Sequence, residues 1–389
     1  MAHKILIVDD EPDLESLVRQ KFRRQVREGR YELTFAQNGK LALEKIAQDE
    51  SIGMVLSDIN MPVMDGLTLL SKLEELNRGL KTVIVSAYGD MKNIRTAMNR
   101  GAFDFVTKPV DYEDLEITIE KTLHAIEAIQ LAQHQRQQLV SIQQELGVAA
   151  RIQLSLMPNN FPAFPDRQDF ELFAAMVPAK EVGGDFYDFF LIDEDHLAII
   201  IGDVSGKGVP AAIFMAVART LLRGTSLLNL PAGDCLTYAN RALARQSDSE
   251  MFVTIFYAVL NTKTGELECS SAGHNPPYLF STAGPRMLVP PRGPVLGVLD
   301  GVTYHTHELQ LQSGDGILLY TDGVSEAANL ADRTKYEFFS EQRIEACLRD
   351  NLNAAPADLV QAVFSSVRAY VGEAPQSDDM TVLAARYLG

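Results

Sequence analysis

KILIVDDE, at residues 4–11, is a short apolar run that ends in three acids. A run of this length, rich in β-branched residues, predicts a buried strand. Four similar runs follow it, separated by stretches of helical periodicity: ELTF at 32–35, MVLS at 54–57, TVIVS at 82–86 and DFVTK at 104–108. Strands that alternate with helices predict an α/β doubly wound domain with a five-stranded parallel sheet, whose ligands bind at the carboxyl ends of the strands.

Reactive side chains stand where four of these predicted strands end: Asp9 and Asp10, Asp58, Ser86, and Lys108. Crowded carboxylates repel one another, and a bound Mg²⁺ with oxygen ligands would relieve that repulsion. Asp58 could then attack a phosphoryl group in line, while Mg²⁺, Lys108 and the Ser86 hydroxyl neutralise its oxygens. One aspartate at a strand end is usually a cap, but five such residues in this order favour a phosphorylation site.

Four motifs resemble the receiver domain of response regulators: ILIVDDE, SDINMPVMDG, VSAYGD and VTKP. The resemblance covers residues 1–122, and it implies that a partner histidine kinase phosphorylates Asp58 and that the Lys108–Pro109 peptide bond is cis. It implies four metal ligands, which are Asp9, Asp10, Asp58 and the backbone carbonyl of Asn60. It also matches Ser86 and Phe105, an aromatic residue where Tyr is more usual, to the switch pair that relays phosphorylation to the distal face.

The stretch from about Tyr112 to Met157 contains no Pro and a single Gly, Gly147. Apolar residues recur at helical spacing in two seams, on either side of a Gln-rich middle, LAQHQRQQ. This pattern predicts one long helix, with a linker at residues 123–157 whose seams suit a coiled-coil homodimer. A single helix packed on its own domains is the alternative. The segment PNNFPAFPDR breaks the helix.

Residues 158–389 are predicted to form a second domain. Strand-like runs outnumber the helices there: ELFAAMV, HLAIIIGD, FVTIFYAVL, GELECSSA, GDGILLYT and MTVLAARY. Helices are expected mainly around 210–225, 232–246, 340–350 and 356–371. Runs of strands with grouped helices predict an α+β fold, an α/β-β/α sandwich.

Four stretches of this domain place an acid beside Gly, Ser or Thr at a predicted strand end: EVGGDFYDFF with Asp185, LAIIIGDVSGKGVPA with Asp203, ILLYTDGVSEA with Asp322, and QSDDMTVL with Asp378 and Asp379. A single Asp-Gly pair is a common turn. Strands that bury runs such as AIII and ILLY must end near one another, however, so their terminal acids would be neighbours. Several carboxylates in one site need cations, and two metal ions can activate a water to attack phosphorus.

These motifs, with ARIQLSLMP, SAGHNPPYLF and GPVLGVL, resemble the metal-dependent (PPM-type) protein phosphatases in their bacterial SpoIIE-like branch, over about residues 150–389. The resemblance implies two Mn²⁺ or Mg²⁺ ions. It implies that Asp185 and Asp203 hold both ions, assisted by the carbonyl of Val204. Asp322 and Asp378 would hold the second ion, with Asp379 beside it. His274 and Lys180 lie in matching motifs without an assigned role.

Three other motifs point to different chemistry. Cys235 and Arg241 have the C-x₅-R spacing of cysteine phosphatases, but their segment reads as a helix and lacks a glycine-rich phosphate loop. GDVSGKG does not meet the G-x-x-x-x-G-K-[ST] pattern of a P-loop. GGDFY echoes the GGDEF signature of diguanylate cyclases, but Phe186 stands where that signature needs an acid.

Composition limits the classes of partner. The formal net charge of −17 argues against nucleic acid and against an anionic membrane surface. The three cysteines form neither a disulfide framework nor a zinc spacing. No apolar run reaches the ~20 residues that span a bilayer, and MAHKILIVDD is not a signal peptide, so we expect a soluble, cytoplasmic protein.

Together these features predict a response regulator in which phosphorylation of Asp58 controls a metal-dependent phosphoserine/phosphothreonine phosphatase. The resemblance implies that the substrate is a phosphorylated anti-sigma-factor antagonist in a partner-switching pathway. The alternative is a phosphorylation-controlled adaptor that binds a sigma-factor regulator without catalysis.

Overall fold

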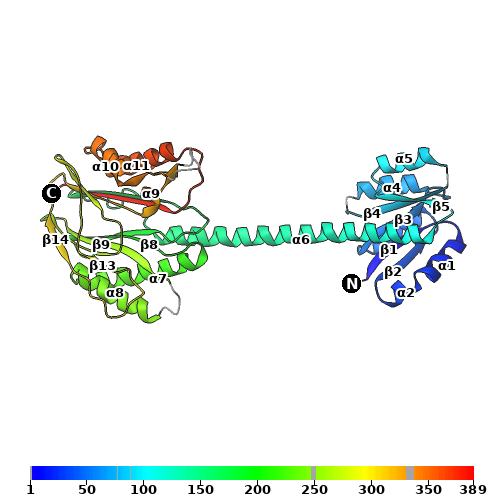
Figure 1. The fold of residues 1–389 in the computed structure, drawn as a ribbon, viewed down its shortest axis with the longest axis horizontal. Coiled ribbons are helices and arrows are strands. Elements are labelled where there is room, and N and C mark those ends of the chain that lie inside the picture. The colour runs from blue at the N-terminus through cyan, green and yellow to red at the C-terminus, as the bar shows by residue number, and fades with distance from the viewer. Residues whose placement is uncertain (1, 77, 88, 247–250, 330–336) are drawn as a thin grey trace. The chain divides into compact units, whose positions relative to one another are not determined.

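The computed structural model describes all residues except 1, 77, 88, 247–250 and 330–336, so Tyr88 of the VSAYGD motif lies outside the described residues. The chain divides into two compact units, Met1–Ser141 and Ile142–Gly389 (Figure 1). One helix, α6 (Tyr112–Leu156), has residues in both units, and it confirms the long helix predicted from the sequence. Among the described helices, none combines the length and apolar character that a bilayer crossing requires.

The first unit contains the predicted five-stranded parallel sheet. Its strands are β1 (His3–Val8), β2 (Tyr31–Ala36), β3 (Ile52–Asp58), β4 (Lys81–Ala87) and β5 (Asp104–Lys108). They lie in the order β2-β1-β3-β4-β5, and every neighbouring pair is parallel. All five runs identified in the sequence are therefore strands of one sheet.

Helices cover both faces of this sheet: α1 (Pro12–Lys21), α2 (Arg23–Arg27), α3 (Gly39–Gln48), α4 (Gly66–Glu75), α5 (Met91–Asn99) and the start of α6. Because successive side chains of a strand alternate between faces, Ile5 and Ile7 pack with Leu115 and Ile119 of α6. The intervening residues of β1 pack instead with α3 and α4. The doubly wound fold follows from strands that are apolar on both faces.

The second unit contains two mixed or antiparallel sheets packed face to face. The first has the order β13-β10-β9-β8-β7, with β14 paired to β10, and the second has the order β12-β11-β15-β18-β6. Their longer strands are β6 (Phe170–Val177), β7 (Phe186–Leu191), β8 (His196–Val204), β9 (Val253–Asn261), β10 (Glu266–Ala272), β15 (Gly316–Tyr320) and β18 (Met380–Tyr387). The shorter ones are β11 (Tyr278–Ser281), β12 (Gly284–Met287), β13 (Arg292–Gly293), β14 (His307–Gln310), and the separate pair β16 (Ala328–Asn329) and β17 (Glu337–Phe338).

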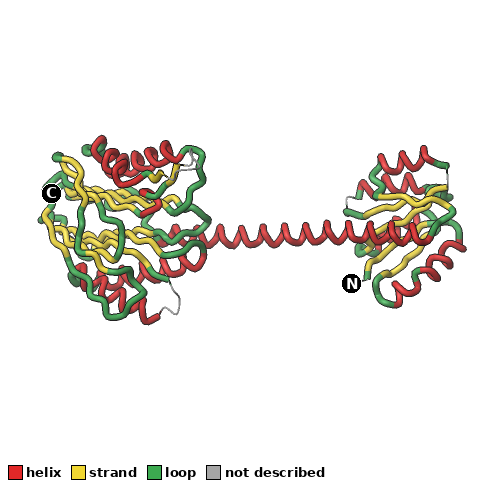
Figure 2. Tube along the Cα trace, in the orientation of Figure 1, coloured by secondary structure: helices red, strands yellow, loops and turns green. Residues whose placement is uncertain are grey.

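Helices lie on the outer faces of these two sheets (Figure 2). They are α7 (Val209–Ser226), α8 (Ala232–Gln246), the short α9 (Asp322–Ser325), α10 (Ser340–Asp350) and α11 (Pro356–Val371). Helices α7 and α8 pack on the first sheet, and α10 and α11 pack on the second. Leu279, Ile317 and Leu383 of the second sheet share one core with the first. The unit is the predicted α/β-β/α sandwich.

Candidate functional site

The predicted phosphorylation residues converge at the carboxyl edge of the sheet in the first unit. Asp9, Asp10 and Asp58 each offer a carboxylate oxygen within 4.8 Å of the other two. Nζ of Lys108 lies 2.9 Å from Oδ2 of Asp58 and 3.1 Å from Oδ2 of Asp9. Three carboxylates this close form an oxygen donor set that fits a divalent cation such as Mg²⁺.

Electrostatics at this edge favour a phosphoryl acceptor. Burial raises the pKa of Asp9, although the backbone N–H of Glu11 and the Lys108 ammonium oppose the change. Burial by itself would lower the pKa of Lys108, but hydrogen bonds and charges from Asp58 and Asp9 raise it instead. Lys108 is therefore held as a cation, ready to neutralise the oxygens of a phosphoryl group.

Three further predicted residues lie around this edge. Ser86 is fully buried in β4, and among the described residues its Oγ has no hydrogen-bond partner. An unpaired buried hydroxyl is costly, and an arriving phosphoryl oxygen could satisfy it. Phe105 of β5 is half-buried and packs against the cluster that contains Ile84 and Ala97, whereas Asn60 is exposed just after β3. The Lys108–Pro109 peptide bond is cis, as the resemblance implied.

In the second unit, strand pairing brings the predicted acids together in two pairs. Phe186 of β7 lies opposite Gly202 of β8, so Asp185 and Asp203 meet at one end of that sheet. Tyr320 of β15 lies opposite Val382 of β18, so Asp322, the first residue of α9, lies close to Asp378. Each sheet of the sandwich therefore contributes one pair of acids.

Two threonines, one just after β15 and one in β18, connect the pairs. Oγ1 of Thr321 and Oγ1 of Thr381 each donate a hydrogen bond of 2.7 Å to Oδ2 of Asp185. Asp185 belongs to the loop that enters the first sheet, so these bonds connect the two sheets at the site. Both bonds are made to the same oxygen of Asp185, Oδ2.

Burial and mutual repulsion disfavour the charged forms of these acids. Burial raises the pKa of Asp185 well above its usual value, and the charge of Asp203 adds to the effect. Burial, Asp322 and Asp378 raise the pKa of Asp203 to about 7. Burial also raises the pKa of Asp322, and Asp378 contributes. Cations would remove this penalty, so the donor set fits a metal site.

The spacing of these acids differs from that of the first site. Within the described part of the chain, no three acids of the second unit bring carboxylate oxygens within 4.8 Å of one another. A pair of metal ions about 3.5–4 Å apart needs ligands spread over a wider area than a single ion does. The wider spacing is thus compatible with two ions.

Asp379 is engaged with the backbone. Its Oδ1 accepts a 2.8 Å hydrogen bond from the N–H of Ala179, and its Oδ2 accepts one of 2.8 Å from the N–H of Gly184. A Cβ added at Gly183 would lie 1.9 Å from Oδ2 of Asp379, and one added at Gly184 would lie 2.6 Å from the carbonyl oxygen of Val204. Glycine is therefore required at both positions, and Asp379 holds the loop that carries Asp185.

Two protein-family models match this chain. The model of stage II sporulation protein E (SpoIIE) matches residues 193–388, about half of the chain. The chain belongs to the SpoIIE family. The model of the response regulator receiver domain matches residues 5–120. The chain therefore combines a receiver domain with a SpoIIE-type phosphatase domain.

Several relatives share one or both parts. Protein IcfG of Synechocystis is 31% identical over 267 residues, which is 62% of this chain and 41% of IcfG. The phosphoserine phosphatase RsbU of Bacillus subtilis is 27% identical over 70% of this chain and 80% of RsbU. The chemotaxis protein CheY of Bacillus subtilis is 34% identical over 32% of this chain and all of CheY. The chain thus spans less than half the length of IcfG.

A solved structure supports the fold of the phosphatase domain. The PP2C domain of SiaA from Pseudomonas aeruginosa has a TM-score of 0.57 and 22% identity, and the match covers 64% of this chain and 98% of that one. At this identity the likeness concerns the fold. It agrees with the sandwich described above.

Two contacts of the SpoIIE-type domain were not anticipated from the sequence. Gln153, near the end of α6, is buried, and its Nε2 donates a 2.7 Å hydrogen bond to the carbonyl of Gly183 while its Oε1 accepts a 3.1 Å bond from the N–H of Gly183. Nζ of Lys207 lies 2.8 Å from Oδ2 of Asp378. Lys207 lies in GDVSGKG, the segment that partly resembles a P-loop but does not meet the P-loop pattern.

Three other motif residues of the SpoIIE-type domain have surroundings that differ from those of the acids. His274 is buried and within 2.9 Å of Oγ1 of Thr254, and burial lowers its pKa to about 4, so it is neutral. Lys180 is exposed. Cys235 is buried in α8, and burial raises the pKa of its thiol to about 11. A cysteine phosphatase needs a thiolate, so the C-x₅-R motif has no such function.

Proposed function

We propose that this chain is a response regulator in which phosphorylation of Asp58 controls a metal-dependent phosphoserine/phosphothreonine phosphatase. The observation that carries the proposal is the meeting of two acid pairs, one from each sheet, joined through Thr321 and Thr381. Membership of the SpoIIE family and similarity to a phosphoserine phosphatase support the same reaction.

Each residue of the phosphatase site has a stated task in this proposal. Asp185, Asp203, Asp322 and Asp378, with the carbonyl of Val204, would hold two Mn²⁺ or Mg²⁺ ions. When bound, such ions supply a nucleophilic water and stabilise the phosphoryl oxygens. Thr321 and Thr381 orient the carboxylate of Asp185. Lys207 offers an ammonium group beside Asp378 and Asp322, where it would attract the negative charge of a phosphorylated side chain.

The receiver site would accept its phosphoryl group from a histidine kinase. Asp58 is the proposed nucleophile, and Asp9, Asp10, Asp58 and the carbonyl of Asn60 would hold Mg²⁺. Lys108 already contacts Asp58, and the hydroxyl of Ser86, which has no partner among the described residues, would donate a hydrogen bond to a phosphoryl oxygen. Phe105 is the proposed second member of the switch pair.

Helix α6 is the proposed connection between the two activities. Leu115, Ile119 and Leu123 of this helix are buried in the receiver core, and Gln153 of the same helix binds Gly183, two residues before Asp185. Leu139, Val140 and Ile142 are exposed along the helix, which suits the proposed homodimer. A change in helix pairing would then reach the loop of Asp185 through Gln153.

The proposed substrate is a phosphorylated anti-sigma-factor antagonist. The similarity to the phosphoserine phosphatase RsbU supports a phosphoserine protein as the substrate class. The test is release of phosphate from a phosphorylated antagonist of the same organism, in Mn²⁺, by the natural chain and by Asp203→Asn. We expect turnover by the natural chain alone. Tight binding without turnover by either protein would instead support the adaptor.

A further inference from the structure

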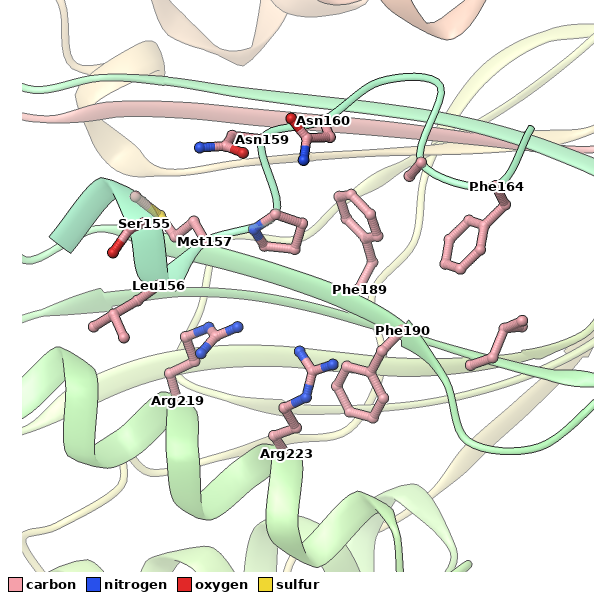
Figure 3. Close-up of a pocket in the computed structure, with 13 residues that line it drawn as sticks. Ser155, Leu156, Met157, Asn159, Asn160, Phe164, Phe189, Phe190, Arg219 and Arg223 are labelled. Atoms are coloured by element: carbon pink, nitrogen blue, oxygen red, sulfur yellow. The ribbon is translucent and has the colours of Figure 1, made fainter. Parts of the chain in front are cut away.

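A cavity of about 600 Å³ lies between the end of α6 and helix α7, beside the edge strand β7 (Figure 3). Its volume falls in the range of small-molecule sites. Two arginines that neither proposed site uses, Arg219 and Arg223, line it from α7. Both guanidinium groups rise from the helix toward the end of α6 and Phe189.

The two arginines share a single carboxylate. Asp188 of β7 is fully buried, and its Oδ2 lies 2.9 Å from Nη2 of Arg219 and 3.1 Å from Nη1 of Arg223. Its Oδ1 also accepts a 2.9 Å hydrogen bond from the N–H of Phe189. Two cations therefore face one anion, which leaves an excess of one positive charge.

Hydrogen-bond donors are in excess as well. Each guanidinium carries five N–H groups, and one carboxylate cannot accept them all. In the described structure Nε of Arg219 is buried and has no hydrogen-bond partner. Arg223 is partly exposed, with 41% of its side chain accessible, so its free N–H groups can reach a ligand. An oxyanion is the group that guanidinium pairs bind best.

The other walls of the cavity suit a ligand with a flat ring and polar edges. Phe164 is half-buried and lines the cavity, and Asn159 and Asn160 add amide groups at the rim. Phe189 is only 4% exposed and supports Phe164 from behind, with the two ring centroids 6.1 Å apart in an edge contact. Among the described residues that line the cavity, none is acidic, in a chain whose net charge is −17. Aromatic rings bind other rings by stacking or edge contacts, and side-chain amides can pair with the edge of a base.

We propose that this cavity binds a mononucleotide, with its phosphate on Arg219 and Arg223 and its base against the open part of Phe164. The ligand would contact the chain from Ser155 to Asn160 on one side and α7 on the other. Binding would thereby fasten the end of α6, the segment that carries Gln153, to the body of the domain.

The test is calorimetric titration of the full chain in EDTA, which keeps the probes from binding through metal ions. We expect AMP to bind with one site per chain, inorganic phosphate to bind about tenfold or more weakly, and adenosine not to bind. Absence of saturable AMP binding would overturn the proposal. Equal affinity for adenosine and AMP would exclude the arginines as the phosphate site, and equal affinity for phosphate and AMP would exclude a base site.

Two variants and one control test whether AMP binds in this cavity. Arg223→Gln should weaken AMP binding about tenfold or more, because a charge-assisted hydrogen bond is lost. Arg349→Gln, which removes the same charge from an exposed ion pair with Glu345, should leave AMP binding unchanged. Asn160→Asp changes an exposed residue at the rim and should also weaken AMP binding, without touching Asp188. AMP affinity that is unchanged in both Arg223→Gln and Asn160→Asp would overturn the assignment.

Discussion

Replacing Gln153 with alanine tests whether the end of α6 controls the loop that carries Asp185. The side chain of Gln153 is 5% exposed and satisfies both the N–H and the carbonyl of Gly183. A buried polar group left without a partner costs about 1–3 kcal/mol. Losing both bonds should therefore destabilise this loop by about 2–6 kcal/mol relative to its observed position.

The substitution should weaken metal binding and remove the control of the phosphatase by the receiver. About 2 kcal/mol corresponds to roughly a thirtyfold change in an equilibrium constant, so Gln153→Ala should bind Mn²⁺ at least about tenfold more weakly. Its phosphatase rate at saturating Mn²⁺ should no longer depend on a phosphodonor. Titration of activity with Mn²⁺, with and without acetyl phosphate, measures both effects.

A matched control separates this contact from a general weakening of the helix. Gln144 lies on the same helix and is exposed, so Gln144→Ala should behave as the natural chain does. If Gln153→Ala kept the natural Mn²⁺ dependence and the natural response to acetyl phosphate, the proposed connection through Gly183 would be wrong.

Three other predictions concern the phosphatase domain. Gly183→Ala should lower the melting temperature and the phosphatase rate, because the added Cβ would lie 1.9 Å from Oδ2 of Asp379. Gly224→Ala is the control: an added Cβ there meets nothing within 4 Å, so this variant should be neutral or stabilise α7 by up to about 1 kcal/mol. Chelating Mn²⁺ should lower the melting temperature of the phosphatase domain in the natural chain but not in Asp203→Asn, since a ligand at 100 times its Kd stabilises by about 2.7 kcal/mol. Hydrogen bonding to Arg167 lowers the pKa of Asp169 to about 2, so its contribution to stability should be present above pH ~4 and be lost as the pH falls toward 2. The difference in unfolding free energy between the natural chain and Asp169→Asn should accordingly shrink between pH 5 and 3, and a constant difference would contradict this reading.

The sequence predicted most of the elements because their signals are local. Each strand of the receiver sheet is a short apolar run, and the absence of proline and near-absence of glycine between Tyr112 and Met157 predicted α6. The run that forms β7 was not among the strand-like runs identified, although Asp185 just before it was placed at a strand end, because FYDFFL neither alternates nor is uniformly aliphatic. Its buried Asp188 is balanced by two arginines of α7, more than thirty residues later in the chain.

Site residues were predictable where a motif places them at a strand end, and less so where tertiary contacts decide. Asp185 and Asp203 stand in recognisable motifs, and strand pairing brings them together. Gln153 lies in ARIQLSLMP, but that motif does not reveal its partner, a backbone group 30 residues away. Lys207 reaches Asp378 across a separation of more than 170 residues along the chain. Only the folded structure shows such contacts.

The most direct test of the central claim compares phosphatase rates of the natural chain and of Asp58→Asn on one phosphorylated antagonist protein in Mn²⁺, each with and without acetyl phosphate. We predict that the rate of the natural chain changes with the phosphodonor and that the rate of Asp58→Asn does not. Equal rates for both proteins under both conditions, with Asp58 shown to be phosphorylated, would contradict control of the phosphatase by the receiver.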